Sequence, residues 1–476
     1  MADPSPLPPE AEPEPEQPAP PDRALFRGGL ALLILTLGYY VFNAEVSSVT
    51  ELYEGLAIIV LATLPTLLWA RRNTHEFPVF EVFMLTGVNI YALPLLNGQS
   101  ELQTYSESVV EQAGAAVIFF QIIANATYAA TRGYPRLTPF WTKDVISRDI
   151  GRYLGYGLVL TTVYTGIYTF SDVIPTDLQG PLRAAFFGIG IITLFIQGRR
   201  WGQGDLSYQE KTSYIINLVL QVIFNFATLY LIIGLSLIVL ALLGYITSSK
   251  RRPILVIAII LPVIALLHNG KTAMREKYWG KEDTFIPSLT DLPGFFAEWI
   301  QDGLDLHQKV GITQKLIERT SLFQIICLVV DNTPDRLPYL NGLTYGQIPG
   351  QFVPRFFWPE KPVGHISTYT LSIYYSLQRE EDTEKTTIAF GLLAEAYANF
   401  GFYGVGLLAA VFAFGLKKYS LWASQSPILS YAGLVLVLLM AWSFQTELTL
   451  SIWLSSLFQA VVAVLGMAFV LRRVLG

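Results

Sequence analysis

Residues 213–247 read SYIINLVLQVIFNFATLYLIIGLSLIVLALLGYIT, a run without one charged side chain. A helix of that length would be about 52 Å long, since each residue adds about 1.5 Å. The hydrocarbon core of a bilayer is only about 30 Å thick. The run is therefore too long for one membrane span, and it predicts two antiparallel helices joined by a tight turn.

Apolar runs of the same character recur along the whole chain. Of its 476 residues, 52% are hydrophobic and 14% are charged, whereas soluble proteins carry about 25% charged residues. We therefore expect an all-α polytopic membrane protein with about twelve transmembrane helices. The predicted spans are residues 28–44, 53–70, 79–96, 109–130, 153–171, 182–198, 213–229, 230–247, 253–268, 388–416, 427–444 and 450–470.

Lys and Arg gather in alternate loops between these spans. The loops that carry them contain Arg71-Arg72, residues 132–152, Arg199-Arg200, residues 250–252, Lys417-Lys418 and Arg472-Arg473. The intervening loops at 45–52, 97–108, 172–181 and 445–449 contain neither residue type. Because cytoplasmic loops are enriched in Lys and Arg, both termini are predicted to be cytoplasmic.

The chain divides into four predicted regions. Residues 1–24 form a Pro- and Glu-rich cytoplasmic tail, which is expected to be disordered because it offers little apolar surface for burial. Residues 25–268 form an N-terminal bundle of about nine helices, and residues 388–476 a C-terminal bundle of about three. Between them, residues 269–387 form a long extracytoplasmic loop. Its apolar run 322–330 is too short to span a membrane, so an interfacial or partly inserted helix is expected there.

Several classes of function are disfavoured by what the sequence lacks. No basic tract indicates a nucleic-acid partner. Cys327 is the only cysteine, which excludes an intrachain disulfide. The four histidines (His75, His268, His307 and His365) lack the spacing of metal ligands, so neither a metal nor another cofactor is predicted. A hard cation bound by carboxylates alone remains an open alternative.

Ionisable side chains lie near the predicted outer ends of two spans. Counted from Arg252, Lys271 and Arg275 are about 28 and 35 Å away along a helix. Counted back from Lys417, Glu395 is about 33 Å away. All three therefore reach the far side of a core about 30 Å thick. Glu395 also interrupts an apolar run, which makes it a functional candidate.

The long loop contains a stiff cationic segment, Pro354-Arg355-Phe356-Phe357-Trp358-Pro359-Glu360-Lys361-Pro362, here called the elbow. Its prolines restrict the backbone, and its aromatic side chains suit a membrane surface. Arg355 and Lys361 offer donors shaped for phosphate. Together with Arg319, earlier in the loop, they are expected to converge with the ionisable groups at the span ends and to bind an anionic lipid-linked substrate.

Each candidate also has a structural interpretation. Lys271 could extend to the surface from a helix end, Arg355 could stack on a neighbouring ring, and Glu395 could form an ion pair with an arginine. Asn399, at i+4 from Glu395, is expected on the same helix face. His268 and His365 are candidate proton carriers, although lone histidines near aromatic residues more often have structural roles.

Six groups of residues resemble the Wzy-type oligosaccharide repeat unit polymerases, the O-antigen polymerase family of bacterial envelopes. They are Asn269-Gly270-Lys271 with Arg275, Arg319-Thr320-Ser321, Thr333-Pro334, Gly342-Leu343-Thr344-Tyr345, Phe352-Val353 with the elbow, and Glu395-Ala396-Tyr397-Ala398-Asn399-Phe400-Gly401. The elbow is the most specific of these groups. The earlier spans resemble the family in topology alone.

The resemblance implies a glycosyltransferase of GT-C-like architecture in the bacterial cytoplasmic membrane. Such an enzyme polymerises oligosaccharide units carried on undecaprenyl diphosphate at the outer face, without nucleotide sugars or an obligatory metal. Its implied partners are the lipid-linked glycan, membrane lipids, and the flippase and chain-length regulator of the same pathway.

Within this hypothesis, catalysis is assigned to Arg275, Arg355 and Glu395. Guanidinium groups stabilise a diphosphate leaving group, and a carboxylate accepts the proton of the attacking hydroxyl or orients an arginine. The residues expected to bind the diphosphate are Lys271, Arg275, Arg319, Arg355 and Lys361. Two alternatives stay open: a polysaccharide ligase with the same cationic site, and a transporter of lipid-linked glycans. The transporter would need charged residues at mid-membrane and internal repeats.

Overall fold

The computed structural model describes residues 23–72, 77–132, 141, 150–229, 231–249, 253–279, 286–304, 321–353, 357–362, 364–383, 387–424 and 426–475. Within these ranges every regular element is a helix and none is a strand. The expected all-α architecture is therefore confirmed for the described parts of the chain.

Seven helices in the described ranges are long and apolar enough to cross a membrane: Arg23–Asn43, Val49–Arg71, Val79–Leu96, Glu107–Ala130, Leu182–Gln203, Gly391–Ala423 and Leu450–Phe469. They support a polytopic membrane protein. The other predicted spans also coincide with helices, but these are shorter or less apolar. Twelve spans are therefore not established.

A succession of helices forms the described parts of residues 23–304. They are α1 (Arg23–Asn43), α2 (Val49–Arg72), α3 (Val79–Gly87), the π-helix η1 (Val88–Ala92), α4 (Leu93–Leu96), the 3-10 helix η2 (Ser100–Thr104), α5 (Glu107–Ala130), α7 (Ile150–Phe170), α8 (Thr176–Gln203), α9 (Tyr208–Ala227), α10 (Leu231–Ser248), α11 (Ile254–Trp279) and α12 (Leu292–Leu304).

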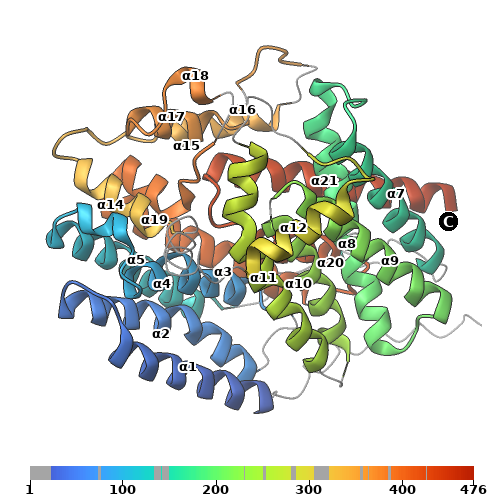
Figure 1. The fold of residues 1–476 in the computed structure, drawn as a ribbon, viewed down its shortest axis with the longest axis horizontal. Coiled ribbons are helices and arrows are strands. Elements are labelled where there is room, and N and C mark those ends of the chain that lie inside the picture. Colours follow the sequence, from blue (N-terminus) through green and yellow to red (C-terminus); the bar gives the residue numbers. More distant parts are fainter. Residues whose placement is uncertain are drawn as a thin grey trace, which may run out of the picture.

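The second half contains the short helices of the long loop and then three longer ones. They are α14 (Phe323–Asn332), α15 (Leu343–Gly346), α16 (Ile348–Phe352), α17 (Ile366–Tyr374), α18 (Glu380–Thr383), α19 (Gly391–Ala423), α20 (Tyr431–Trp442) and α21 (Leu450–Leu475). Figure 1 shows α15 to α18 gathered along the upper edge of the molecule, with α1 and α2 along the lower edge.

The apolar run 213–247 forms the predicted helical hairpin. α9 ends at Ala227 and α10 begins at Leu231. The turn between them is closed by a hydrogen bond of 2.8 Å from the Leu229 amide to the Phe226 carbonyl. Leu229 has a positive φ of 60°, which allows the chain to reverse within so few residues.

Contacts at the helix ends agree with the predicted grouping of basic loops. Lys418 Nζ donates to the carbonyl oxygen of Arg132 at 2.7 Å, so two of these loops lie at the same end of the bundle. Lys417 Nζ lies 4.1 Å from the ring centroid of Tyr128, near the end of α5. Which side of a membrane this end faces stays a prediction.

The main hydrophobic core lies among α2, α3, α5, α14, α19, α20 and α21. α14 belongs to this core, because Phe323, Ile326 and Cys327 are fully buried. The apolar run 322–330 is thus a short helix, as predicted. It packs against α5 and α19, and its position relative to a membrane stays a prediction.

A second core lies among α9, α10, α11 and α12. α11 continues to Trp279, past the predicted span end at residue 268, so the long loop begins later than expected. α12 packs along α11, and the fully buried Trp299 donates from Nε1 to the Leu267 carbonyl at 2.6 Å. A Cβ at Gly270 would lie 2.6 Å from the Trp299 carbonyl, so glycine is needed for this close approach.

α19 consists of two helical segments that meet at a sharp break. Phe400 (φ −146°, ψ 15°) and Gly401 (φ 59°, ψ −144°) leave the helical region. The chain then folds back on itself, since a Cβ at Gly404 would lie 2.3 Å from the Ala396 carbonyl oxygen. In a straight helix, residues eight positions apart are about 12 Å apart. The count from Lys417 that placed Glu395 at the outer boundary therefore does not hold.

Candidate functional site

Hydrogen bonds inside the protein join the starts of α14 and α19 to distant parts of the chain. The Leu322 amide, before α14, donates to the Ile90 carbonyl at 3.1 Å. The Gly391 amide, at the start of α19, donates to the Glu447 carbonyl at 2.9 Å, in the connection between α20 and α21. Non-helical backbone is tolerated at membrane depth only where the protein satisfies its polar groups. These long-range hydrogen bonds meet that requirement.

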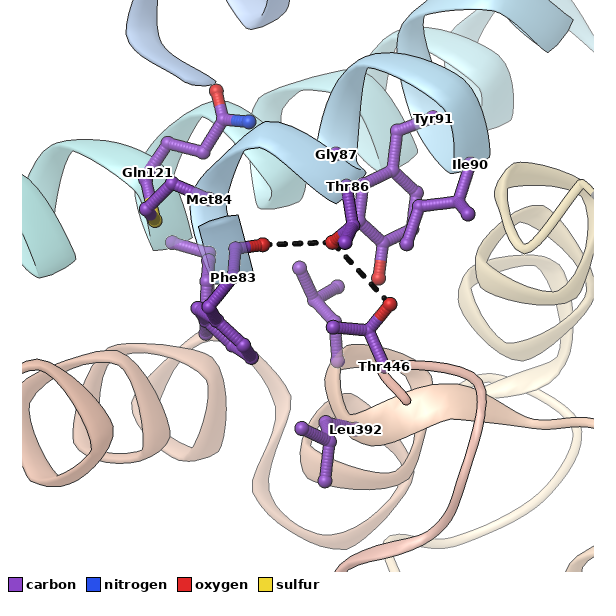
Figure 2. Close-up of a pocket in the computed structure, with 11 residues that line it drawn as sticks. Phe83, Met84, Thr86, Gly87, Ile90, Tyr91, Gln121, Leu392 and Thr446 are labelled. Carbon is purple, nitrogen blue, oxygen red and sulfur yellow. Dashed lines mark hydrogen bonds between the residues drawn. The ribbon is translucent and has the colours of Figure 1, made fainter. Parts of the chain in front are cut away.

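A small cavity lies at this junction, and Figure 2 shows the residues that line it. Thr86 Oγ1 donates to the Phe83 carbonyl at 2.7 Å and accepts from Thr446 Oγ1 at 3.3 Å, which joins α3 to the α20–α21 connection. The cavity measures about 30 Å³. That volume suits roughly one or two water molecules, so a sugar does not fit here.

Glu395 lies on the first segment of α19, one turn from this junction. Its side chain is completely buried. Oε2 accepts a hydrogen bond of 2.6 Å from the amide of Leu450, the first residue of α21. The positive end of a helix dipole stabilises a carboxylate placed in this way. The amide at this helix terminus is thus a partner of Glu395, while an ion pair with an arginine, the structural alternative considered above, stays untested because Arg319 and Arg355 lie outside the described residues.

Asn399 and Thr344 complete a buried polar group around Glu395. Both side chains are fully buried. Asn399 Nδ2 donates to Thr344 Oγ1 and to the Glu395 carbonyl oxygen, each at 2.8 Å. Asn399 therefore shares the face of Glu395, as predicted, and links it to the long loop.

The break in α19 leaves backbone carbonyls to which the long loop is hydrogen-bonded. The amides of Leu340 and Asn341 donate to the carbonyls of Ala398 and Asn399, at 3.0 and 3.1 Å. The Gly342 amide donates to Asn399 Oδ1 at 3.0 Å. Residues 339–344, here called the docking segment, thus bind to carbonyls that the break releases from the helix.

The described part of the elbow is fixed to α16 by its lysine. Lys361 Nζ donates to the carbonyl oxygens of Gln351 and Val353, at 3.2 and 2.8 Å, at the C-terminal end of that helix. α16 in turn packs on α21, where the rings of Phe352 and Phe458 lie 5.0 Å apart. Arg355 and Phe356 lie outside the described residues, as does Arg319.

The two basic candidates on α11 belong to the second core. Arg275 Nη2 donates to the Leu229 carbonyl at 2.8 Å, in the turn of the α9–α10 hairpin. His268, Lys271 and Arg275 stand at i, i+3 and i+7 of α11, so they share one face of that helix. The convergence of this group with Glu395 stays a prediction.

His365, the other histidine candidate, begins α17 near the elbow. Burial and the nearby positive charge of Arg183 lower the pKa of His365 below its usual value. The guanidinium of Arg183 lies 5.6 Å from the ring centroid of Tyr168. Sequence reasoning missed Arg183 because it counted this residue within the apolar span 182–198.

A larger polar cavity of about 170 Å³ lies between the α1–α2 and α4–α5 connections. Glu45, Glu51 and Glu107 are among the residues that line it. In the part of the chain that the structure describes, no group of three or more His, Cys, Asp or Glu side chains is arranged to hold a metal ion.

Sequence reasoning also missed the role of Thr344 and of the Leu450 amide. Thr344 was part of a motif, but nothing in its sequence context indicated which side chain it would contact. In comparisons with protein-family models, with curated proteins and with solved structures, no match to this chain was found. The site is therefore interpreted from its own geometry and from the resemblance of its motifs.

Proposed function

We propose that this protein is a membrane-embedded glycosyltransferase that polymerises oligosaccharide units carried on undecaprenyl diphosphate. One observation carries the proposal: Thr344 from the long loop is hydrogen-bonded to Asn399, one helical turn from the fully buried Glu395 of the broken helix α19. The elbow is connected to the same region through α16 and α21. Three of the motif groups that resemble the polymerase family thus belong to neighbouring parts of the fold.

In the proposed reaction, a hydroxyl group at the non-reducing end of one lipid-linked unit attacks the anomeric carbon of the growing chain. The new glycosidic bond forms as the bond from that carbon to the diphosphate oxygen breaks. Undecaprenyl diphosphate leaves with the bonding electron pair. The proton of the attacking hydroxyl passes to a carboxylate, and we assign this role to Glu395.

Cations of the elbow stabilise the charge that develops on the diphosphate. Arg355 is assigned to bidentate binding, because the guanidinium fork matches two phosphate oxygens. Lys361 already donates to two carbonyls of the α16 end, so we assign it to holding the elbow in place. The contact of Arg275 with the Leu229 carbonyl favours a structural role for that residue.

A transporter of lipid-linked glycans is the second candidate, and the helix breaks favour it. Discontinuous helices whose ends meet within the membrane are typical of transporter substrate sites. The breaks at Gly391 and at Phe400-Gly401 have this character, and the fully buried Glu395 lies between them. We rank it second because the motif groups around Glu395 and in the elbow resemble those of the polymerase family.

The decisive test uses purified protein in vesicles loaded with a synthetic undecaprenyl-diphosphate oligosaccharide. A polymerase converts this single substrate into a ladder of longer chains and releases undecaprenyl diphosphate. A ligase forms product only after a separate lipid or protein acceptor is added. Transfer of the unchanged substrate across the bilayer would identify a transporter, and no change under any of these conditions would overturn the proposal.

The role of Arg355 is tested by Arg355→Lys, which keeps the charge but removes the fork. If the fork contributes about 3 kcal/mol at the transition state, turnover falls on the order of a hundredfold. Arg379→Lys is the matched control, because Arg379 is an exposed arginine of the same long loop. Full-length polymer at the wild-type rate from well-expressed Arg355→Lys protein would remove Arg355 from the site.

A further inference from the structure

The described part of the elbow is joined to α16 at two places. Lys361 Nζ donates to the carbonyl oxygens of Gln351 and Val353, at the end of that helix. A Cβ at Gly350 would lie 3.2 Å from the ring of Trp358, so the indole packs directly on α16. The elbow and α16 therefore lie side by side.

α16 is in turn attached to the side of α21. The rings of Phe352 and Phe458 meet edge to face, with their centroids 5.0 Å apart. Phe458 belongs to the candidate membrane span Leu450–Phe469 and is itself 41% exposed. Val462, at i+4 on the same face, is also exposed. The surface of α21 that receives α16 is thus continuous with an exposed apolar face of a span.

The position of Phe458 along α21 gives the depth of this contact. Arg472, in the basic group predicted to mark the cytoplasmic end, follows 14 residues later in the same helix. Fourteen residues of α-helix extend about 21 Å, and the hydrocarbon core is about 30 Å thick. Phe458 therefore lies about 9 Å below the opposite boundary, and Phe352 lies beside it. A tilt of α21 would place both rings deeper.

The side chains of the elbow suit a position in lipid. Phe357 is 76% exposed and Trp358 is 43% exposed. Exposed apolar patches mark surfaces that contact a partner or a membrane, and Trp is enriched where a protein meets the membrane interface. The last carbonyls of a helix have no partner within the helix, and lipid offers no water to bind them. Lys361 supplies donors to this end of α16, as a segment in lipid requires.

We propose that the elbow is inserted into the outer leaflet of the membrane, where Phe357 and Trp358 contact lipid chains. Lipid, rather than a second protein, is the occupant because the elbow and α16 continue the exposed apolar face of α21. The long loop then does not lie wholly in the extracytoplasmic space. This inference goes beyond the proposed function and holds equally for a transporter.

The test measures the depth of spin labels in the full-length protein, in a Cys327→Ala background. Phe357→Cys in the elbow is compared with Val462→Cys, exposed on α21, and with Arg379→Cys, exposed in the long loop. Each variant carries a nitroxide in vesicles of phosphatidylethanolamine and phosphatidylglycerol. Oxygen concentrates in the hydrocarbon and a nickel chelate stays in water, so the ratio of their collision rates with the label reports depth.

The oxygen-to-nickel ratio at Phe357→Cys should match that at Val462→Cys and exceed that at Arg379→Cys. A ratio equal to that at Arg379→Cys would place the elbow in water and overturn the proposal. A label shielded from both reagents would also overturn it, because a protein surface would then cover the elbow.

A second measurement changes only one ring of the elbow. Brominated lipid chains quench tryptophan fluorescence on contact, so the intensity that they remove should be smaller in Trp358→Phe than in the wild type. An equal loss in both proteins would overturn the proposal. Neither measurement uses activity. A lipid-inserted elbow in a protein that makes no polymer would keep this inference and reject the proposed function, and a polymerase with its elbow in water would do the reverse.

Discussion

Replacing Gly401 by alanine should destabilise the protein through the break in α19. Gly401 has φ 59° and ψ −144°, a conformation that is almost restricted to glycine. A Cβ at this position would also lie 2.7 Å from the hydroxyl oxygen of Tyr339, in the docking segment. The substitution therefore strains the backbone and pushes the docking segment away from α19.

The size of the effect follows from these two contributions. A side chain forced into a sparsely populated backbone region costs about 1–3 kcal/mol. Displacing Tyr339 adds about 1 kcal/mol, because the group in the way is the end of a side chain and can move. The total of about 2–4 kcal/mol corresponds to a roughly 30-fold to 900-fold change in the unfolding equilibrium.

The assay is thermal unfolding in detergent micelles, with limited proteolysis of the docking segment as a second readout. Gly415→Ala is the control, because Gly415 lies in the same helix and a Cβ there would meet nothing within 4 Å. That variant should be as stable as the wild type or slightly more stable. Gly401→Ala combined with Tyr339→Phe should recover only the smaller, steric part. A Gly401→Ala protein that unfolds like Gly415→Ala would refute the reasoning.

Three further outcomes are expected. Leu289 and Gln209 are both exposed, in loops predicted to lie on opposite sides of the membrane. In a Cys327→Ala background, Leu289→Cys should react with an impermeant thiol reagent in intact cells, and Gln209→Cys should not. The opposite pattern would reverse the predicted orientation. Ser207→Ala should cost about 1 kcal/mol at neutral pH, measured by thermal unfolding, because Ser207 and Glu210 form a capping box at the start of α9. Hydrogen bonds from Ser207 lower the pKa of Glu210 in the folded protein. The stability that they contribute is therefore present above the pKa of Glu210 in the unfolded chain, and it is lost as the pH falls through the pKa in the folded protein. A loss of stability in Ser207→Ala that stays constant down to acidic pH would contradict this. Lys361→Met should increase proteolysis near the elbow, since two hydrogen bonds to the end of α16 are lost, and unchanged cleavage would show that other contacts hold the elbow.

Hydrophobicity and length were sufficient to predict the helical hairpin of α9 and α10 and the positions of most long helices. They report how much of a segment can be buried, and they say little about where a helix changes direction. Phe400-Gly401 lies in an apolar run that also contains other glycines, so its sequence does not distinguish a break from a close helix contact. Short buried helices such as α14 were recognisable as too short to span, but their depth depends on partners far along the chain.

The candidate site was predictable only in part. A carboxylate in an apolar run marked Glu395, and helical spacing placed Asn399 on its face; both observations were local. The Leu450 amide and the Thr344 hydroxyl are more than fifty residues away from Glu395 in sequence, and a backbone amide leaves no signal in a side-chain pattern. The straight-helix count failed for a related reason, because the carbonyls at the break are hydrogen-bonded by the docking segment, more than fifty residues earlier in the chain.

The shortness of α20 has a consequence for how the protein is made. Its 12 residues extend only about 18 Å, well below the thickness of the membrane core. A segment of this length leaving the ribosome partitions poorly into lipid by itself. Its neighbours α3, α8 and α19 precede it in the chain, so the surface that receives it is already synthesised when it emerges. α20 is therefore expected to enter the membrane together with α21, as a pair that settles against an already inserted bundle, and a nascent chain that ends after Trp442 should leave α20 outside it.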